Sequence, residues 1–573
     1  MTATDAHAAV GATADENCTA EAQRAQCRGA APLRPYLFAV ILGTGAWGRR
    51  GTWLLLALSW LAFATRVVGL TAQSLWRDEV DALRFATQAL PALLEMFRRP
   101  GENGPLFFLG LRPWLAVAGT SEFALRFPSA AMAALSVPVF YALMRRLVCA
   151  RSTSAVAALL LATAPYGIWY GQEAKMYAAL LLWICAGMYL TVAASWQGGW
   201  WRWALLYGMT GAGFYTHLLA ALVVPVQAIW LMILPALAAG RSAEWARRRR
   251  LVGLLYLALL IGPYLPLARW QAPMWLAGQT ETGYPFVPLP MILLVQLVAF
   301  GRGILPLTQP IVLLPTAVAL LAGVVLWPFL GRIQDRCDIR RGRTGADENV
   351  GAHGRAPLPH GGRHFQDRNA PAGAARRWLL VGLLLAWLLL PAIGIYVISL
   401  RRPLFADRYL IWTMPAFLGL VGLGVSALRR MLRPLGAALL AALVALNLAA
   451  AAGQMAQPIK SDFRAAAAFV MAHKQPGDRL LFQIPYNRYT FSYYSGELDG
   501  WLDGPYTNHG MSEAELDAQM ARATADLSAV WLIASEVPMW DARGLTEAWL
   551  AAHGTVMQRA EFARVTVTRY QLR

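Results

Sequence analysis

Long apolar runs without charged side chains recur between residues 53 and 459, and they constrain the fold more than any other feature of this sequence. An α-helix needs roughly 20 predominantly apolar residues to cross a bilayer. Only 14% of the 573 residues are charged, whereas soluble domains contain about 25%. The sequence therefore predicts a mainly α-helical, polytopic membrane protein and excludes a soluble globular enzyme.

Eleven segments have the length and flanking charges of membrane spans. They are residues 51–70, 125–144, 153–170, 177–195, 203–216, 218–238, 251–268, 311–330, 378–399, 409–427 and 434–452. Two other apolar stretches, 105–119 and 289–305, are expected to lie along or dip into the outer face. Counting only one of them as a span would move later basic loops to the outer side.

The arginines lie in clusters between the apolar runs, so the net charge of +19 indicates membrane topology and not nucleic-acid binding. With a cytoplasmic N-terminus, every strong cluster falls on the cytoplasmic side, including the arginine-rich loop 331–377. The outer face then receives the first outer loop, 71–124, the turn at 171–176, the neighbourhood of His217 and the loop 400–408.

Three regions follow from these patterns. Residues 1–50 are expected to form a disordered cytoplasmic tail and an interfacial segment, because they lack the basic start of a secretory signal. Residues 51–455 form the transmembrane domain. Residues 456–573 are expected to form a small extracytoplasmic α/β domain, because short buried strands alternate there with helical patterns. The five cysteines have no spacing that indicates a disulfide framework or a zinc site.

The first outer loop contains three carboxylates, Asp78, Glu79 and Asp81. On a helix, Asp78 and Asp81 share a side while Glu79 points elsewhere. A carboxylate at the edge of an apolar scaffold suits a general base, and Arg66 or Arg77 is expected to keep it ionised. A helix N-terminus also attracts acidic residues, and composition alone favours that simpler interpretation.

Other polar residues fall on the same face. Lys175 is one of only three lysines, and a lone lysine at the membrane edge is a candidate for holding a phosphate, although it can equally be a lysine that extends to the interface. His217 interrupts a charge-free run as a turn residue, a proton carrier or a metal ligand. Arg408 supplies a second cation. The remaining candidates for a substrate pocket are Glu102, Asn103, Arg126, Gln172, Glu173, Tyr177 and Tyr409.

Several motifs resemble those of the bacterial GT-C membrane glycosyltransferases, the family-39 group of protein O-mannosyltransferase-like enzymes and aminoarabinose transferases. They are SLWRDEV (74–80), GPLFF (104–108), EFALRFPSA (122–130), IWYGQEAKMYA (168–178), FYTHLLA (214–220), RPLFADRYLIWTMPAF (402–417), SDFRAAAAFV (461–470) and PGDRLL (476–481). Their order and spacing extend the resemblance from about residue 50 to residue 495.

The resemblance implies a GT-C catalytic domain in a bacterial cytoplasmic membrane, with its active site on the extracytoplasmic face. It implies an inverting transfer of a sugar from a polyprenyl-phosphate donor to a glycan, lipid or protein acceptor. Asp78 matches the family's catalytic base and Glu79 is its customary neighbour. Lys175 and Arg408 are expected at the donor phosphate.

Two positions depart from the family pattern. Asn103 stands where histidine is common, and Lys175 stands where arginine is usual, which keeps the charge but loses the bidentate fork. Metal use stays open, with Glu102 and His217 as the candidate ligands of a divalent metal. A transporter or flippase of lipid-linked sugars and an inactive scaffold of an envelope complex are the alternative functions. The sequence shows neither the internal repeats nor the midplane ionisable residues common in transporters.

Overall fold

The computed structural model describes residues 48–98, 103–238, 241–276, 284–306, 308–330, 373–496 and 499–573. Residues Leu55–Arg573 form one compact unit. The expected tail and interfacial segment (1–47), Glu102 and most of the loop 331–377 lie outside the described residues.

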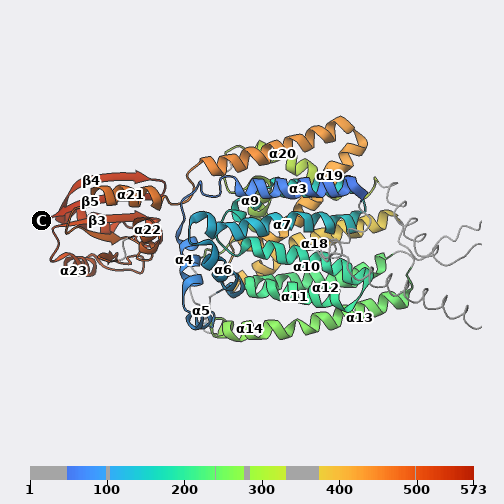
Figure 1. The fold of residues 1–573 in the computed structure, drawn as a ribbon, viewed down its shortest axis with the longest axis horizontal. Coiled ribbons are helices and arrows are strands. Elements are labelled where there is room, and N and C mark those ends of the chain that lie inside the picture. Colours follow the sequence, from blue (N-terminus) through green and yellow to red (C-terminus); the bar gives the residue numbers. More distant parts are fainter. Residues whose placement is uncertain are drawn as a thin grey trace, which may run out of the picture. The chain divides into compact units, whose positions relative to one another are not determined.

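The helical part of the chain has the following elements, shown in Figure 1. The α-helices are α3 (Gly48–Val67), α4 (Arg77–Thr87), α5 (Leu90–Met96), α6 (Pro105–Ala118), α7 (Glu122–Val148), α8 (Arg151–Thr163), α9 (Pro165–Gly171), α10 (Tyr177–Gln197), α11 (Trp200–Thr216), α12 (Val223–Ile233), α13 (Ala243–Leu259), α14 (Ile261–Leu276), α15 (Leu289–Arg302), α16 (Leu314–Leu321), α18 (Gly373–Ser399), α19 (Met414–Met431) and α20 (Arg433–Ala456). Shorter helical turns are η2 (Leu218–Leu222), η3 (Leu234–Leu237), η4 (Pro310–Leu313), η5 (Ala322–Leu326) and η6 (Asp407–Thr413).

Among the described residues, seven helical segments are long and apolar enough to cross a membrane, or eight if the bent pair α8 and α9 is one span. The chain is therefore a multi-pass membrane protein. Two of the eleven predicted spans, 203–216 and 311–330, are helical over only 17 residues each, at Trp200–Thr216 and Pro310–Leu326, the lower limit for a span. The count of eleven stays a prediction. The two stretches expected not to cross contain α6 and α15, each 14 residues long.

The predicted span 153–170 is not one straight helix, because α8 and α9 meet at an angle of 52°. Pro165 has no backbone N–H and cannot complete the bond to the carbonyl of Leu161. The guanidinium of Arg66 donates to that carbonyl at 3.0 Å and to the carbonyl of Ala162 at 2.8 Å. Arg66 is fully buried, and its hydrogen bonds replace those that the helix backbone lacks at this break. It is not the partner of Asp78, and that expectation was wrong.

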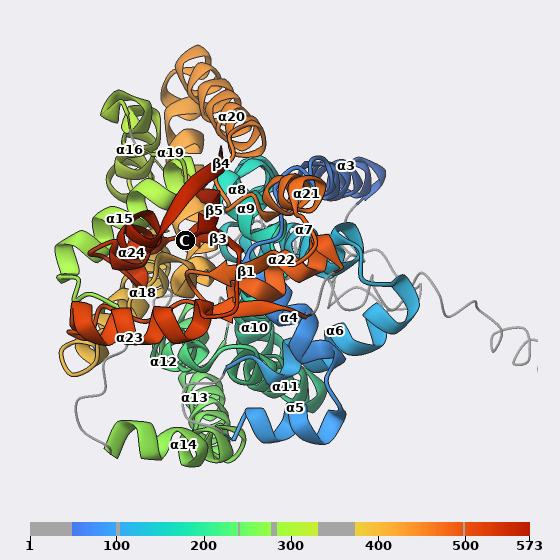
Figure 2. The same ribbon diagram turned by 90° about the vertical axis from the view of Figure 1, so that its left-hand side faces the viewer.

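The C-terminal region forms the predicted α/β domain, which we call the outer domain (Figure 2). Its five-stranded sheet has the order β2-β1-β3-β5-β4, with β1, β2 and β3 parallel and β5 antiparallel to β3 and β4. The elements are α21 (Phe463–His473), β1 (Arg479–Phe482), α22 (Asn487–Ser495), β2 (Trp501–Asp503), α23 (Glu513–Thr524), β3 (Ala529–Ser535), η7 (Val537–Met539), α24 (Leu545–His553), β4 (Gly554–Phe562) and β5 (Val565–Leu572).

Helices cover both faces of this sheet because its central strands alternate buried side chains between two cores. Trp531 and Ile533 of β3 pack with α21 and α22, whereas Val530 and Leu532 pack with α23 and α24. Strand β3 is buried along its whole length. This explains why an uninterrupted apolar run, typical of a strand covered on both faces, marks it in the sequence.

A buried ion pair closes one end of the sheet. The Asp478 carboxylate accepts hydrogen bonds from Arg569 at 2.8 and 2.9 Å and from the Trp531 indole at 3.1 Å. Burial acts to raise the pKa of Asp478, but the hydrogen bonds, that of Arg569 first, outweigh it and lower the pKa.

We expect Asp478→Asn to lower the free energy of unfolding of the outer domain by about 3 kcal/mol, because it leaves the Arg569 charge buried and unpaired. The full loss of unfolding free energy should be observed at pH values above about 3.9, the pKa of an aspartate in the unfolded chain. The loss should disappear as the pH falls through the lower pKa that Asp478 has in the folded protein. Urea unfolding of the intact protein measures this loss of stability, with proteolytic cleavage within residues 456–573 as the signal of unfolding. Glu547→Gln, which breaks the exposed pair with Arg559, is the control and should cost less than about 1 kcal/mol. Equal effects of the two variants would contradict the prediction.

Candidate functional site

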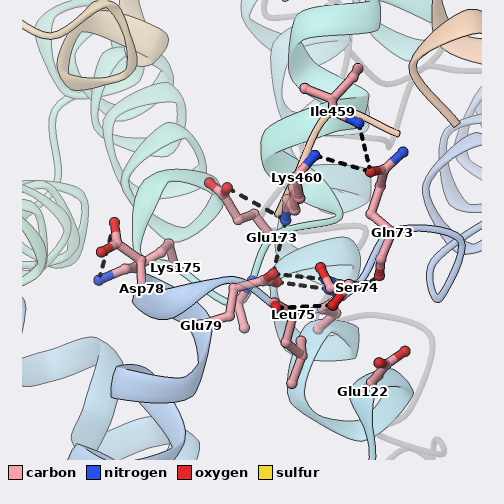
Figure 3. Close-up of polar contacts among 12 residues, drawn as sticks. Gln73, Ser74, Leu75, Asp78, Glu79, Glu122, Glu173, Lys175, Ile459 and Lys460 are labelled. Atoms are coloured by element: carbon pink, nitrogen blue, oxygen red, sulfur yellow. Dashed lines mark hydrogen bonds and ion pairs between the residues drawn. The ribbon is translucent and has the colours of Figure 1, made fainter. Parts of the chain in front are cut away.

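Helix α4 places two adjacent carboxylates in different surroundings. Asp78 and Glu79 both lie in its first turn, and neighbouring side chains on a helix point in directions about 100° apart. Glu79 is fully buried, whereas the side chain of Asp78 keeps 18% of its exposure. Figure 3 shows the two carboxylates turned toward different partners.

Every oxygen of Glu79 is held. Arg126 of α7 donates to both at 2.7 Å, the backbone N–H of Ala174 donates to Oε1 at 2.9 Å, and Lys460 Nζ lies 2.8 Å from Oε2. Burial acts to raise the pKa of Glu79, but the charges of Arg126 and Lys460 outweigh it and keep the pKa well below its usual range. Glu79 is therefore an ionised anchor between α4, α7 and the turn after α9.

Lys460 adds a second carboxylate to this cluster. Its Nζ lies 3.6 Å from Oε1 of Glu173, which is buried in the turn between α9 and α10. Burial raises the pKa of Glu173, in spite of the Lys460 charge. The other oxygen of Glu173 has no hydrogen-bond partner among the described residues.

Asp78 is held much less firmly. Lys175 Nζ lies 3.9 Å from one oxygen and Arg77 Nη2 lies 3.7 Å from the other. Both distances exceed those of a hydrogen-bonded ion pair. Asp78 therefore has two cations nearby, and its carboxylate oxygens stay available to a further hydrogen-bond partner. The predicted partner Arg77 is confirmed in this position.

Arg408, on η6, lies in a cluster of aromatic side chains that come from η6, the start of α10, the residue after α11 and the segment before α15. Its Nε donates to the hydroxyl of Tyr177 at 3.0 Å, and its guanidinium lies over the ring of Tyr409. The Tyr409 ring lies 4.8 Å from that of His217, and its hydroxyl shares a 2.7 Å hydrogen bond with Tyr284. Tyr177 follows Lys175 by two residues. Through its contact with Tyr177, Arg408 therefore lies next to the segment that carries Lys175, the other predicted phosphate-binding cation.

His217 has one ring nitrogen already engaged. The backbone N–H of Leu219 donates to its Nδ1 at 3.2 Å. Burial, with the Arg408 charge second, lowers the pKa of His217 to about 3, so the ring is neutral at physiological pH and carries its proton on Nε2. A metal at Nε2 would require that proton on Nδ1, facing the Leu219 N–H. The geometry suits a hydrogen-bond donor better than a metal ligand.

The remaining candidates from the sequence hold the loops together. Asn103 Oδ1 accepts from the N–H of Leu218 at 2.9 Å, and Gln172 donates to the carbonyls of Arg66 and Val68. Gly104 has φ +86°, a left-handed backbone conformation that favours glycine at the start of α6. Glu102 lies outside the described residues.

Asp81 points to the side of α4 that Asp78 shares, as predicted, but it pairs with Arg84 at 3.0 Å. Burial raises the pKa of Asp81. No group of three or more potential metal ligands occurs among the described residues. Of the five cysteines, Cys149 and Cys185 are described, and Cys185 is buried.

The sequence interpretation missed the contribution of the outer domain. Lys460 reaches Glu79, Arg464 pairs with Glu122, and the Tyr494 hydroxyl accepts from the N–H of Leu75 at 2.7 Å. The scarcity of lysine and the motif beginning at residue 461 were the available signals. These signals did not indicate the contact partners of Lys460, Arg464 and Tyr494, which lie nearly four hundred positions earlier in the chain.

The contacts bring the predicted outer loops together at one end of the helices. We compared this chain with protein families, with curated protein sequences and with solved structures. Residues 102–266 match the family described as dolichyl-phosphate-mannose-protein mannosyltransferase. A comparison with curated protein sequences finds no significant match.

The chain is also similar to two crystal structures of ArnT from Cupriavidus metallidurans, one in the apo state and one bound to undecaprenyl phosphate. The TM-scores are 0.52 and 0.50, the sequence identity is 14% in both, and the similarity covers 91% of this chain and 98% of ArnT. This chain therefore has the fold of the GT-C membrane glycosyltransferases, as the motifs of its loops predict.

Proposed function

We propose that this protein is an inverting glycosyltransferase that moves a sugar from a polyprenyl-phosphate donor to an acceptor of the cell envelope, at the outer face of a bacterial cytoplasmic membrane. The observation that carries the proposal is the loose pair of Asp78 and Lys175, 3.9 Å apart. It places a carboxylate that can take a proton beside a cation that can hold a phosphate.

The displacement needs the base and the departing phosphate on opposite faces of one sugar carbon, so Lys175 and Asp78 must move apart when the donor binds. Asp78 removes the proton of the acceptor hydroxyl as the hydroxyl oxygen bonds to the anomeric carbon. The bond from that carbon to the phosphate oxygen breaks, and the electron pair leaves with the polyprenyl phosphate. One displacement inverts the configuration, as in single-displacement glycoside chemistry.

Lys175 and Arg408 stabilise the charge that develops on the phosphate. Phosphate binding draws Lys175 away from Asp78, which frees the carboxylate to act as the base. Binding of undecaprenyl phosphate by ArnT, a protein of the same fold, supports a donor of this class. Glu79 keeps α4 in place and takes no part in proton transfer, because its oxygens are occupied.

The first test is consumption of a panel of polyprenyl-phosphate hexoses and pentoses by the purified protein in detergent, with an envelope extract as the source of acceptors. Without two compartments, a flippase has no reaction to perform, whereas an enzyme consumes its donor. Donor consumption that requires the extract supports the proposal and identifies the sugar. No consumption of any donor by folded protein contradicts it.

We expect Asp78→Asn to lower kcat about a hundredfold or more, because the variant cannot accept the proton. KM for the donor should change less than about threefold, since the phosphate contacts remain. Asp81→Asn is the matched control, because it makes the same change one turn along α4, on a residue paired with Arg84. Its kcat should stay within about threefold of wild type. An unimpaired Asp78→Asn enzyme would refute the assignment of the base.

Lys175→Met should lower kcat/KM for the donor about a hundredfold, because the leaving phosphate loses a cation. Lys175→Arg should recover at least about a tenth of the wild-type value, since the charge is restored. Steady-state kinetics with varied donor concentration measure both. The phosphate role is disproved if Met and Arg at this position behave alike.

His217→Gln should retain more activity than His217→Leu, because only glutamine can replace the N–H donated by Nε2. Treatment with a chelator should change the rate less than about twofold, since the ring is set up as a donor. Initial rates of the three proteins, with and without chelator, distinguish the alternatives. Chelator-sensitive wild-type activity, lost equally in both variants, would indicate a metal ligand instead.

A further inference from the structure

The link between α20 and α21, residues 457–462, is tied to the segment that leads into Asp78. The Gln73 side-chain oxygen accepts from the backbone N–H groups of Ile459 at 3.1 Å and Lys460 at 3.2 Å. Its side-chain nitrogen donates to the carbonyls of Gln454 and Gln457. One glutamine thus holds the end of α20 and the backbone of the link, and Figure 3 shows its contacts with Ile459 and Lys460.

Side chains of the outer domain hold the same segment. Arg464 donates to the carbonyls of Thr71 and Gln73 at 3.1 and 3.3 Å. The rings of Tyr486, just before α22, and Tyr489, within α22, lie under the guanidinium groups of Arg77 and Arg84 on α4. Segment 70–75 and α4 therefore depend on the outer domain for their position.

Within these contacts, Lys460 differs from an ordinary buried ion-pair partner. Glu79 is already neutralised by two hydrogen bonds from Arg126, so it does not need a second cation. Lys460 nevertheless approaches Glu79 to 2.8 Å and Glu173 to 3.6 Å. Its ammonium group lies between two carboxylates that belong to different elements, and it is buried with both.

Each of these carboxylates is close in sequence to a residue of the proposed reaction. Glu79 is adjacent to Asp78, and Glu173 precedes Lys175 by two residues. The intervening Ala174 donates its N–H to Glu79, which joins the turn directly to α4. A displacement of Lys460 would change the separation of the base and the phosphate-binding cation.

We propose that Lys460 is a positioning residue, through which the outer domain sets the separation of Asp78 on α4 and Lys175 on the turn after α9. The proposal rests on the proposed function. A merely structural ion pair would affect the amount of folded protein and not the turnover of each folded molecule. A positioning residue affects turnover through Asp78.

The test uses the full-length protein with Lys460→Met, which removes the charge and keeps an unbranched side chain. Lys474→Met, at the other end of α21, is the control with the same change of charge. We expect Lys460→Met to lower kcat roughly tenfold to a hundredfold, because small misplacements of catalytic groups have effects of this size. In an Asp78→Asn background, the same substitution should lower the residual kcat less than about twofold, since residues that act as a unit are not additive.

Hydrogen exchange of the intact protein gives a second readout that needs no activity. Peptides covering 70–82 and 172–176 should exchange about tenfold faster in Lys460→Met, whereas α6 and the Lys474→Met protein should match wild type. The double variant Glu173→Gln with Lys460→Met tests for a folding defect. It removes one buried charge of each sign and leaves the Glu79–Arg126 pair intact, so it should be as stable as wild type to within about 1 kcal/mol and still be slow.

The outcomes separate the two proposals. If wild type consumes no donor, the proposed function fails, and the exchange of 70–82 and 172–176 alone decides whether Lys460 positions these segments. Wild-type exchange in both segments overturns the proposal. So does wild-type kcat in Lys460→Met, or a loss of kcat that is undiminished in the Asp78→Asn background.

Discussion

The rest of the site depends on the burial of one carboxylate, that of Glu79. An unpaired charge removed from water is costly, and the loss of one partner from a buried pair destabilises a protein by about 3–5 kcal/mol. Glu79 therefore depends on Arg126, which balances its charge, and it also accepts hydrogen bonds from the Ala174 N–H and Lys460. These partners come from α7, the turn after α9 and the link to the outer domain. The requirement to satisfy one side chain assembles three distant parts of the chain.

The neighbouring carboxylate has the opposite relation to its surroundings. Asp78 faces cations at distances too long for strong hydrogen bonds, so its oxygens stay available to another partner. A fully hydrogen-bonded Glu79 and a partly exposed Asp78 are adjacent in one turn of α4. The helix thus directs an anchoring carboxylate and the proposed base to different surroundings, and the anchor fixes the position of the turn that carries both.

Local patterns predicted much of this arrangement. Hydrophobic runs identified the helical segments, the buried runs marked β1 and β3, and the helix period predicted that Glu79 diverges from Asp78 and Asp81. The motifs around Asp78, Lys175 and Arg408 directed attention to loops that do meet. These features depend on residues close in sequence, where periodicity and turn chemistry carry the information.

Other features could not be read in this way. Arg66 was assigned to Asp78 because it lies nearby in the sequence, but its guanidinium satisfies carbonyls left free by the break at Pro165. Lys460, Arg464 and Tyr494 contact positions far earlier in the chain, and no local pattern encodes such pairings. For Glu79, an acidic residue at a helix N-terminus was the expectation from composition, but its burial depends on tertiary partners.

The link at 457–462 also bears on how such a protein can change through evolution. By composition it begins the outer domain, but through Gln73 and Lys460 it belongs physically to the loop before α4. Recombination that exchanged the sheet domain at residue 456 would discard contacts made by the link, by Arg464 and by α22. An exchange that retained these segments would leave the strands and the helices α23 and α24 free to diverge. The part of the outer domain that can be exchanged without loss of these contacts therefore begins after α22, whereas the composition of the sequence changes near residue 456.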